Sequence, residues 1–418
     1  VAAAADMRYK LAQALEACCE DNVNCREQLD KLPQAQIGTL HSLCSRLIKT
    51  CFYLTDADPA FEMLGESEAA AMKTAAVEAA FACGGDRFSV VYDALLSGRS
   101  DKVLKHLVLT LLDFSRTQPD PDGWLDGCLK LYDDPAAVDA ALAALYGEER
   151  DRLTAAAEQL LVDTEAAGYA RNVAACRALV DYIETGVSPK SPTGKVGDHI
   201  ELNERYKALR DSVKAYREEV ESADALPTAD AAKADAQLFV RLVRETARAY
   251  ADMKAKKALL DYSDLEHKAL EILEAGGDEA AQYKYVFVDE YQDINPLQER
   301  IVERLARGAE LFQVGDVKQS IYAFRLCDPG IFLKRFAAYR AGAGGRAVEL
   351  NVNYRSDGGV LQAVNRVFDR WMTPAFGGVD YAAQAQLKCG RGQHTPNAAT
   401  LTVVCGSDKP DLPEVYRV

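Results

Sequence analysis

Apolar positions recur every three to four residues along much of the first 235 residues. Helical spacing is clearest in two runs. They comprise Val173, Cys176, Val180 and Ile183, followed by Leu202, Tyr206, Leu209, Val213, Tyr216 and Val220. The second run is too short for an independent coiled coil, which needs three to four heptads. The pattern therefore predicts helices that pack on one another in a helical subdomain over residues 56–235.

The segments around this subdomain predict helices and connections. Residues 2–17 are rich in strong helix formers. The short apolar segment 35–39 is expected to end a strand, and a second helix is expected from His41 to Thr50. Residues 187–199 carry Pro, Ser, Gly and Lys, which is typical of an exposed loop. Residues 221–236 are predicted to form a connection.

The pattern changes after Leu238. A helical pattern over residues 239–250 is followed by three short apolar runs, at residues 285–288, 311–314 and 347–350. Each run is bounded by turn or cap residues, and helical patterns lie between them. Strands that alternate with helices indicate a parallel sheet, so the predicted fold class is α/β.

Two acids, Asp289 and Glu290, directly follow the first of these apolar runs. Ligands of an open parallel sheet bind at the carboxyl ends of its strands. Hydrolysis of a nucleoside triphosphate needs an oxygen ligand for Mg²⁺ and a group that positions or activates water. Asp289 and Glu290 are candidates for these two roles. An apolar strand that simply ends in solvated acids has the same local sequence.

The second and third apolar runs also lead into candidate binding residues. Gln319 is a neutral amide that can bind a phosphate oxygen or a water. Tyr322, Phe324 and Arg325 offer planar faces on which nucleobases can stack, although Phe324 is equally compatible with a helix core. Arg355, after the third run, can reach a phosphate or form a surface ion pair.

Composition sets limits on the class of protein. The chain has 418 residues, of which 49% are hydrophobic and 27% charged, as in globular proteins with two or three domains. No run approaches the length of about 20 apolar residues that a membrane span needs. Asp6 and Arg8 make the N-terminus unlike a signal peptide.

Charge and cysteine content narrow the class further. Lys and Arg number 49 and Asp and Glu 64, and 49 − 64 gives a net charge of −15. This excludes an overall basic nucleic-acid coat but not a local basic groove. The 11 cysteines have irregular spacing and no C-x-x-C pair. A reducing, cytoplasmic location is therefore expected, without a disulfide framework or a zinc ribbon.

Several ordered segments together resemble one family. VDEYQD (288–293), VGDVKQSIYAFR (314–325) and ELNVNYRS (349–356) resemble motifs II, III and IV of superfamily 1A DNA helicases of the UvrD/Rep type. TLHSLC (39–44) resembles motif Ib, and AAAADM (2–7) the end of motif Ia. LLDYSDLEHKAL (259–270) is similar to the segment that returns to the first RecA-like domain. Lys318 and the segment 325–329 are most similar to the AddA branch, the helicase–nuclease subunits of AddAB recombination complexes.

The resemblance implies an architecture: a RecA-like, P-loop NTPase-type parallel sheet, a large inserted all-helical subdomain, and the start of a second RecA-like domain. The implied bounds are 1–55 and 236–345 for the first RecA-like domain (1A), 56–235 for the helical insertion (1B), and 346–418 for the start of the second (2A). Such a chain is part of an ATP-dependent motor that moves on single-stranded DNA and unwinds duplexes in double-strand-break repair and recombination.

The resemblance also implies roles for single residues. Asp289 binds Mg²⁺, Glu290 activates water, and Gln319 and Arg355 contact the γ-phosphate of ATP. The residues implied along the DNA are Thr39, His41, Tyr322, Phe324 and Arg325. ATP and Mg²⁺ are the implied cofactors. The implied partners are DNA and an AddB-like subunit. For His41 alone, a core or cap histidine is the simpler interpretation.

The sequence lacks one part of the family's ATP site, the P-loop G-x-x-x-x-G-K-[ST]. Thr193-Gly194-Lys195 is the nearest segment, and it lacks the spaced Gly and the following hydroxyl. The chain begins inside the motif Ia segment and ends before motifs V and VI and any nuclease domain. We therefore expect a fragment of a longer helicase with little or no ATPase activity by itself.

Other interpretations remain open at this point. The chain could be a naturally P-loop-less relative that binds DNA or a partner, or a mainly helical interaction module. An iron–sulfur cluster is a weaker hypothesis, because Cys18, Cys19 and Cys25 lack cluster spacing. Ordinary buried thiols are the expectation for these three cysteines.

Overall fold

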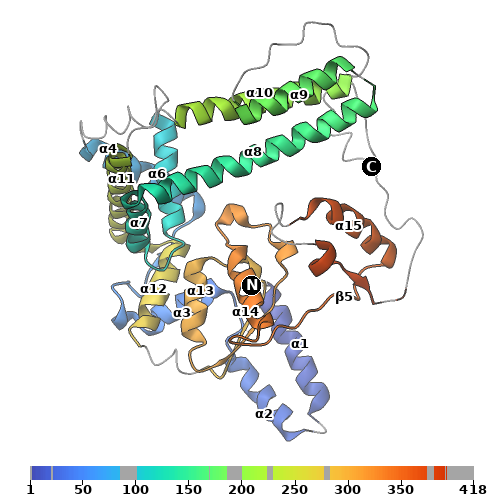
Figure 1. Ribbon diagram of the computed structural model, residues 1–418. Coiled ribbons are helices and arrows are strands. Elements are labelled where there is room, and N and C mark those ends of the chain that lie inside the picture. The colour runs from blue at the N-terminus through green and yellow to red at the C-terminus, as the bar shows by residue number, and fades with distance from the viewer. Residues whose placement is uncertain are drawn as a thin grey trace. The chain divides into compact units, whose positions relative to one another are not determined.

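The computed structural model describes residues 2–19, 22–84, 101–168, 170–185, 200–223, 229–276, 283–373, 381–390 and 392. The fold is mixed α/β and mostly helical, with three pairs of short parallel strands (Figure 1). The chain divides into two compact units, Val1–Ala281 and Gln282–Val418, and each is described by itself. Over the described residues, no helix combines the length and the apolar character that a membrane crossing requires.

The first unit is built almost entirely of helices. They are α1 (Ala2–Cys18), α2 (Val23–Lys31), α3 (Leu40–Thr50), α4 (Glu66–Gly84), α6 (Asp101–Ser115), α7 (Pro121–Lys130), α8 (Pro135–Ala166), α9 (Ala170–Thr185), α10 (Ile200–Ala223), α11 (Ala229–Ala255) and α12 (Tyr262–Glu274). Strands β1 (Glu62–Met63) and β2 (Leu259–Leu260) pair in parallel. Helix α12 packs on α3.

Helices α8, α9 and α10 lie side by side and share one apolar core (Figure 1). Its buried members are Leu153, Ala157, Leu179, Ile183, Val213 and Tyr216. Tyr206, Leu209 and Val220 pack against them. The predicted helices over 173–183 and 202–220, and their packing on one another, are therefore confirmed. A second core joins α4, α6, α7 and α11.

A buried ion cluster joins the C-terminal part of α11 to the start of α12. The Lys254 ammonium, which is only 2% exposed, contacts Asp261 at 2.8 Å and also Asp264. Arg116, just after α6, donates to Asp264 at 2.7 Å. The Tyr250 hydroxyl donates to Asp261 at 2.9 Å. Two cations thus balance two carboxylates, which is what burial of these charges requires.

The same two carboxylates begin helix α12. Asp261 is its N-cap and accepts the backbone N–H of Asp264 at 2.8 Å, while the Asp264 carboxylate accepts the Asp261 N–H at 3.0 Å. This capping box satisfies two backbone donors that a helix start leaves unpaired. The chain's entry into α12 is therefore fixed both by the cap and by the ion cluster.

Two predictions for the first unit are wrong. Residues 35–39 form no strand, because no partner strand lies beside them among the described residues. Instead, the Arg8 guanidinium donates to the Leu32, Pro33 and Ala35 carbonyls, each at 3.2 Å. The connection predicted over 221–236 is shorter, because α10 reaches Ala223 and α11 begins at Ala229. The alanine-rich segment 229–236 favours helix. The loop predicted at 187–199 lies outside the described residues.

In its described part, the second unit contains two parallel strand pairs and three α-helices. Strand β3 (Tyr285–Val288) pairs with β4 (Glu310–Gln313), and β5 (Val352–Asn353) pairs with β6 (Lys388–Cys389). The helices are α13 (Pro296–Leu305), α14 (Pro329–Arg340) and α15 (Gly358–Trp371). The predicted strand 285–288 is confirmed, and β4 begins one residue before the predicted run. A small core of Tyr291, Ile294 and Val302 lies beneath this pair.

The strand predicted at 347–350 is wrong. These residues are not paired, and Leu350 is 84% exposed. Pairing begins one residue later, where the Lys388 N–H donates to the Asn351 carbonyl at 2.9 Å, and β5 starts at Val352. A strand needs a partner for its backbone groups, and in the described residues the partner β6 reaches only this part of the apolar run.

Candidate functional site

The carboxylate pair lies at the carboxyl end of β3, where the sequence predicts it. The Asp289 Oδ1 accepts the Glu290 backbone N–H at 3.0 Å, and both side chains are exposed. Glu290 has φ 52° and ψ 40°, in the left-handed region. This conformation costs a non-glycine residue on the order of 1–3 kcal/mol, and such residues cluster at functional sites. The strained turn presents two carboxylates to solvent at the end of the strand.

One buried amide connects this strand end to the end of β4. The Gln292 Nε2 donates to Glu290 Oε2 at 2.8 Å and to Asp293 Oδ2 at 3.2 Å. Its Oε1 accepts the Asp316 backbone N–H at 2.9 Å. Burial, followed by the charge of Glu290, raises the pKa of Asp293 above its ordinary value. Sequence reasoning missed Gln292, although it lies within the quoted VDEYQD segment.

At the end of β4, Asp316 holds the turn that carries Gln319. The Asp316 carboxylate caps the 3₁₀ turn η6 (Val317–Gln319) and accepts from the Lys318 ammonium at 2.7 Å. The Gln319 Nε2 donates to its other oxygen at 3.0 Å. Burial alone would raise the pKa of Asp316, but the hydrogen bonds from Lys318 and Gln319 lower it below its ordinary value. Asp316 is thus an ionised anchor for both side chains.

The three planar side chains predicted after this turn form one exposed group. The Tyr322 and Phe324 ring centroids are 5.9 Å apart. The Arg325 guanidinium lies 5.0 Å from the Tyr322 ring and 5.6 Å from the Phe324 ring. Phe324 is 75% exposed on the short turn η7 (Ala323–Arg325), so the alternative of a helix-core phenylalanine is wrong.

Arg355 follows β5 in a turn held by Asn353. The Asn353 side-chain oxygen accepts the Arg355 backbone N–H at 2.9 Å and the Ser356 N–H at 2.8 Å. This arrangement fixes the backbone from which the guanidinium projects. The described contacts do not join Arg355 to Asp289, Glu290 or Gln319.

Thr39 and His41 lie at the start of α3, in the first unit. Thr39 is the N-cap, and its Oγ1 accepts the Ser42 N–H at 3.2 Å. The His41 Nε2 lies 2.9 Å from an oxygen of the buried Glu266 on α12. The His41 ring also contacts the Tyr262 ring, with centroids 4.7 Å apart. Tyr262, which directly follows the α12 N-cap, is exposed and was not a predicted site residue.

The carboxylate pair has the donor chemistry that suits Mg²⁺. This ion is usually held by one or two carboxylates together with waters and substrate phosphates. Asp289 and Glu290 offer such oxygens at an exposed strand end. Nowhere in the described ranges is a group of three or more His, Cys, Asp or Glu arranged to hold a metal by itself. The two carboxylates could thus supply one or two of the six oxygen ligands of a Mg²⁺ ion.

The cysteines near the N-terminus are not ordinary buried thiols. Cys18 is exposed, and Cys19 and Cys25 are half-buried. The expectation of burial is therefore wrong for Cys18 and only partly met by the other two. The cause is the position of these residues where α1 ends and α2 begins.

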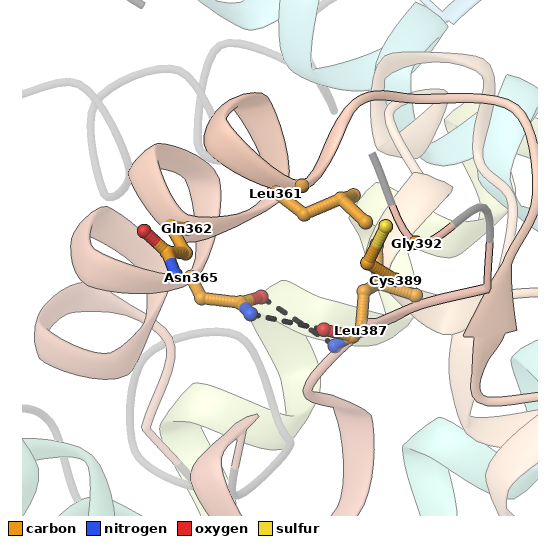
Figure 2. A pocket seen from close by; sticks show the side chains of 7 residues that line it. Leu361, Gln362, Asn365, Leu387, Cys389 and Gly392 are labelled. Carbon is orange, nitrogen blue, oxygen red and sulfur yellow. Dashed lines mark hydrogen bonds between the residues drawn. The ribbon is translucent and has the colours of Figure 1, made fainter. Parts of the chain in front are cut away.

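A separate pocket of about 270 Å³ lies between α15 and the segment around β6. Its lining comprises Gly358, Leu361, Gln362, Asn365, Leu387, Cys389 and Gly392. Figure 2 shows the Asn365 amide turned toward Leu387, whose carbonyl accepts from Asn365 Nδ2 at 3.0 Å. No predicted site residue belongs to this lining. The pocket is thus distinct from the carboxylate pair.

Comparisons with known proteins identify similar sequences. The profile of the UvrD/REP helicase N-terminal domain matches residues 1–339. The A subunit of an ATP-dependent helicase/nuclease from Bacillus licheniformis is 35% identical over 96% of this chain and 37% of its own length. The proteins of the same name from Geobacillus kaustophilus and Desulforudis audaxviator are 34% and 33% identical over 93% of this chain. The chain spans little more than a third of these relatives' length.

Proposed function

The chain belongs to the UvrD/REP helicase family, and from this membership we propose that it is the motor core of an ATP-dependent helicase that moves on single-stranded DNA. The observation that carries the proposal is the arrangement at the ends of β3 and β4. Asp289, Glu290 and Gln319 are held there by one continuous set of hydrogen bonds. These residues lie within the part of the chain that matches the family.

We propose the domain organisation that the resemblance implies. Residues 1–55 and 236–345 form a RecA-like domain, 56–235 a helical insertion, and 346–418 the start of a second RecA-like domain. The packed bundle of α8, α9 and α10 and the parallel pair β3–β4 support this division. In this arrangement the strand ends that carry the carboxylates face the nucleotide.

The proposed hydrolytic roles follow from the chemistry of the strand ends. Asp289 is a ligand of the Mg²⁺ that accompanies ATP, and the ion neutralises charge on the phosphates. Glu290 accepts a proton from the attacking water. Gln319, a neutral amide, hydrogen-bonds the γ-phosphate. The position of its turn, which Asp316 anchors, therefore depends on whether the γ-phosphate is present. Arg355 contacts the same phosphate as a fixed cation.

Single-stranded DNA is the proposed second ligand. Tyr322, Phe324 and Arg325 form an exposed planar group on which bases can stack, with Arg325 supplying positive charge for the backbone. Thr39 and His41 are proposed as further contacts to single-stranded DNA. The short segment between Gln319 and Phe324 links the state of the bound nucleotide to the affinity for DNA.

The whole parent protein is proposed to act in double-strand-break repair and recombination together with an AddB-like subunit. The similar proteins are named as the A subunits of helicase/nucleases, which supports a multi-subunit enzyme. By themselves, the 418 residues lack the G-x-x-x-x-G-K-[ST] sequence that holds ATP phosphates. We therefore propose that this polypeptide alone hydrolyses ATP poorly.

ATP-dependent strand separation by the full-length gene product tests the proposal. Glu290→Gln should abolish unwinding. Glu310→Gln should leave it intact, because Glu310 is an exposed carboxylate at the opposite end of the same strand pair. Unwinding that persists in Glu290→Gln would refute the proposed site. A wild-type protein that binds DNA but never hydrolyses ATP would favour the alternative of a non-catalytic binding module.

A further inference from the structure

Gln292 is a buried amide whose bonds reach both strand ends. It is 1% exposed, and all three of its described side-chain hydrogen bonds go to the segments that follow β3 and β4. Two bonds donate to carboxylates and one accepts a backbone N–H. The amide supplies both functions from one side chain, whereas a carboxylate lacks the donor and an ammonium lacks the acceptor.

The two segments approach so closely at Gln292 that a side chain at Gly315 would force its neighbours to shift. A Cβ on Gly315 would lie 2.8 Å from the Gln292 Oε1, 3.2 Å from its backbone nitrogen and 2.9 Å from the Phe332 ring. The backbone ladder also continues past the strands, since the Tyr291 N–H donates to the Val314 carbonyl at 2.9 Å. The two strand ends therefore contact each other through their backbones as well as through the Gln292 side chain.

The bonds of Gln292 complete a chain that runs from one proposed catalytic group to another. Glu290 accepts from Gln292 at 2.8 Å, and Gln292 accepts from the Asp316 N–H at 2.9 Å. Asp316 accepts from Gln319 at 3.0 Å. These three hydrogen bonds therefore link the position of Glu290 to that of Gln319.

We propose that Gln292 is a positioning residue that fixes Glu290 relative to the Asp316 turn. Glu290, which activates the water, and Gln319, which binds the γ-phosphate, are thereby held in the relative positions that hydrolysis needs. This inference rests on the proposed function. Within that function, Gln292 touches neither ATP nor the water. It acts by setting the direction of the Glu290 carboxylate and by holding the turn that carries Gln319.

Two substitutions of Gln292 distinguish its hydrogen bond to Glu290 from its hydrogen bond to the Asp316 N–H. Gln292→Met has a similar size but removes all three hydrogen bonds. Gln292→Glu keeps an acceptor for the Asp316 N–H but loses the donor to Glu290 and Asp293. Gln313→Met is the matched control, because the Gln313 amide nitrogen on β4 is buried without a described partner.

Steady-state ATP hydrolysis by the full-length gene product, with single-stranded DNA present, is the first measurement. Gln292→Met should lower kcat by about 10- to 100-fold, the size expected for a misplaced catalytic group, with little change in the KM for ATP. Gln292→Glu should lower kcat by a similar factor, again with little change in the KM for ATP, because it also loses the donor to Glu290. A merely structural role would not confine the loss to kcat. Gln313→Met should leave kcat unchanged.

Amide hydrogen exchange in the 418-residue chain is the second measurement, and it does not depend on ATPase activity. The peptide around Asp316 should exchange faster in Gln292→Met and remain protected in Gln292→Glu. If the wild-type full-length protein lacks ATPase activity, the proposed function fails, and exchange alone decides the structural link.

Two results would overturn the inference. One is a kcat of Gln292→Met within about twofold of wild type. The other is unchanged exchange around Asp316 in that variant. If Gln292→Met does not fold, the kcat of Gln292→Glu decides, and a value within about twofold of wild type counts against the role.

Discussion

Replacement of Lys254 by methionine should strongly destabilise the first unit. Lys254 is 2% exposed and contacts both Asp261 and Asp264. Its ammonium also lies 4.1 Å from the centre of the Tyr250 ring. Methionine preserves the volume of the stem but leaves two buried carboxylates with Arg116 as their remaining cation. Removing one partner of a buried ion pair costs about 3–5 kcal/mol.

Lys257→Met is the matched control, three residues further along the chain. Lys257 pairs with Glu68 at 3.2 Å, and both side chains are more than half exposed. Exposed ion pairs contribute about 0–1 kcal/mol. The two lysine-to-methionine changes should therefore differ by about 3 kcal/mol in the free energy of unfolding.

Urea denaturation followed by the fluorescence of Trp124 measures this difference. Trp124 is one of two tryptophans and packs against the α4–α6–α7–α11 core of the first unit. The other, Trp371, lies in the second unit and can be removed as Trp371→Phe. With a urea m-value of about 3 kcal/mol/M, Lys254→Met should lower the midpoint by about 1 M or more. Equal midpoints for the Lys254 and Lys257 variants would refute the reasoning.

The destabilisation should also depend on pH in a defined direction. Burial alone would raise the pKa of Asp261, but Arg116 and Lys254 outweigh it and hold the pKa well below its usual range. A carboxyl with a depressed folded pKa contributes stability above its unfolded pKa of about 3.9. This contribution is lost as the pH falls through the folded pKa. The wild-type advantage over Lys254→Met should therefore be full at pH 6 and shrink below about pH 4.

Two further predictions concern exposure and burial at single side chains. Phe324→Ala should weaken binding of the 418-residue chain to a fluorescent oligo-dT by about 1–3 kcal/mol in anisotropy titrations. Phe287→Ala, which removes an equally exposed ring on β3, should not, and equal losses would count against base stacking on Phe324. Burial, followed by the charge of Glu266, raises the pKa of the Cys44 thiol to about 12. In the folded chain at pH 8, an aromatic disulfide reagent should therefore modify the exposed Cys83 and spare Cys44, as peptide mass mapping would show; equal labelling would contradict this.

The sequence predicted the elements whose signals are local. The helices of the α8–α9–α10 bundle follow from apolar spacing, and β3 follows from an apolar run that ends at Asp289. The strand at 347–350 was wrong because strand formation depends on a partner elsewhere in the chain. Leu350 is apolar but remains exposed where β6 does not reach.

In the candidate site, too, local features could be predicted from the sequence, whereas contacts between distant residues could not. Asp289 and Glu290 could be placed because a strand end is a local feature. The role of Gln292 could not, because its acceptor bond is to a residue 24 positions away in the sequence. Nor does the sequence reveal that Glu290 has a left-handed backbone, which depends on the turn that joins β3 to α13.

Single-stranded-DNA-stimulated ATP hydrolysis by the full-length gene product and its Glu290→Gln variant tests the central claim most directly. Glutamine preserves the shape of the side chain but cannot accept the proton of the attacking water. General-base catalysis contributes about 10²- to 10⁴-fold. We predict that Glu290→Gln still binds ATP and DNA but hydrolyses ATP at least about 100-fold more slowly. Hydrolysis at the wild-type rate in this variant would contradict the proposed role of Glu290.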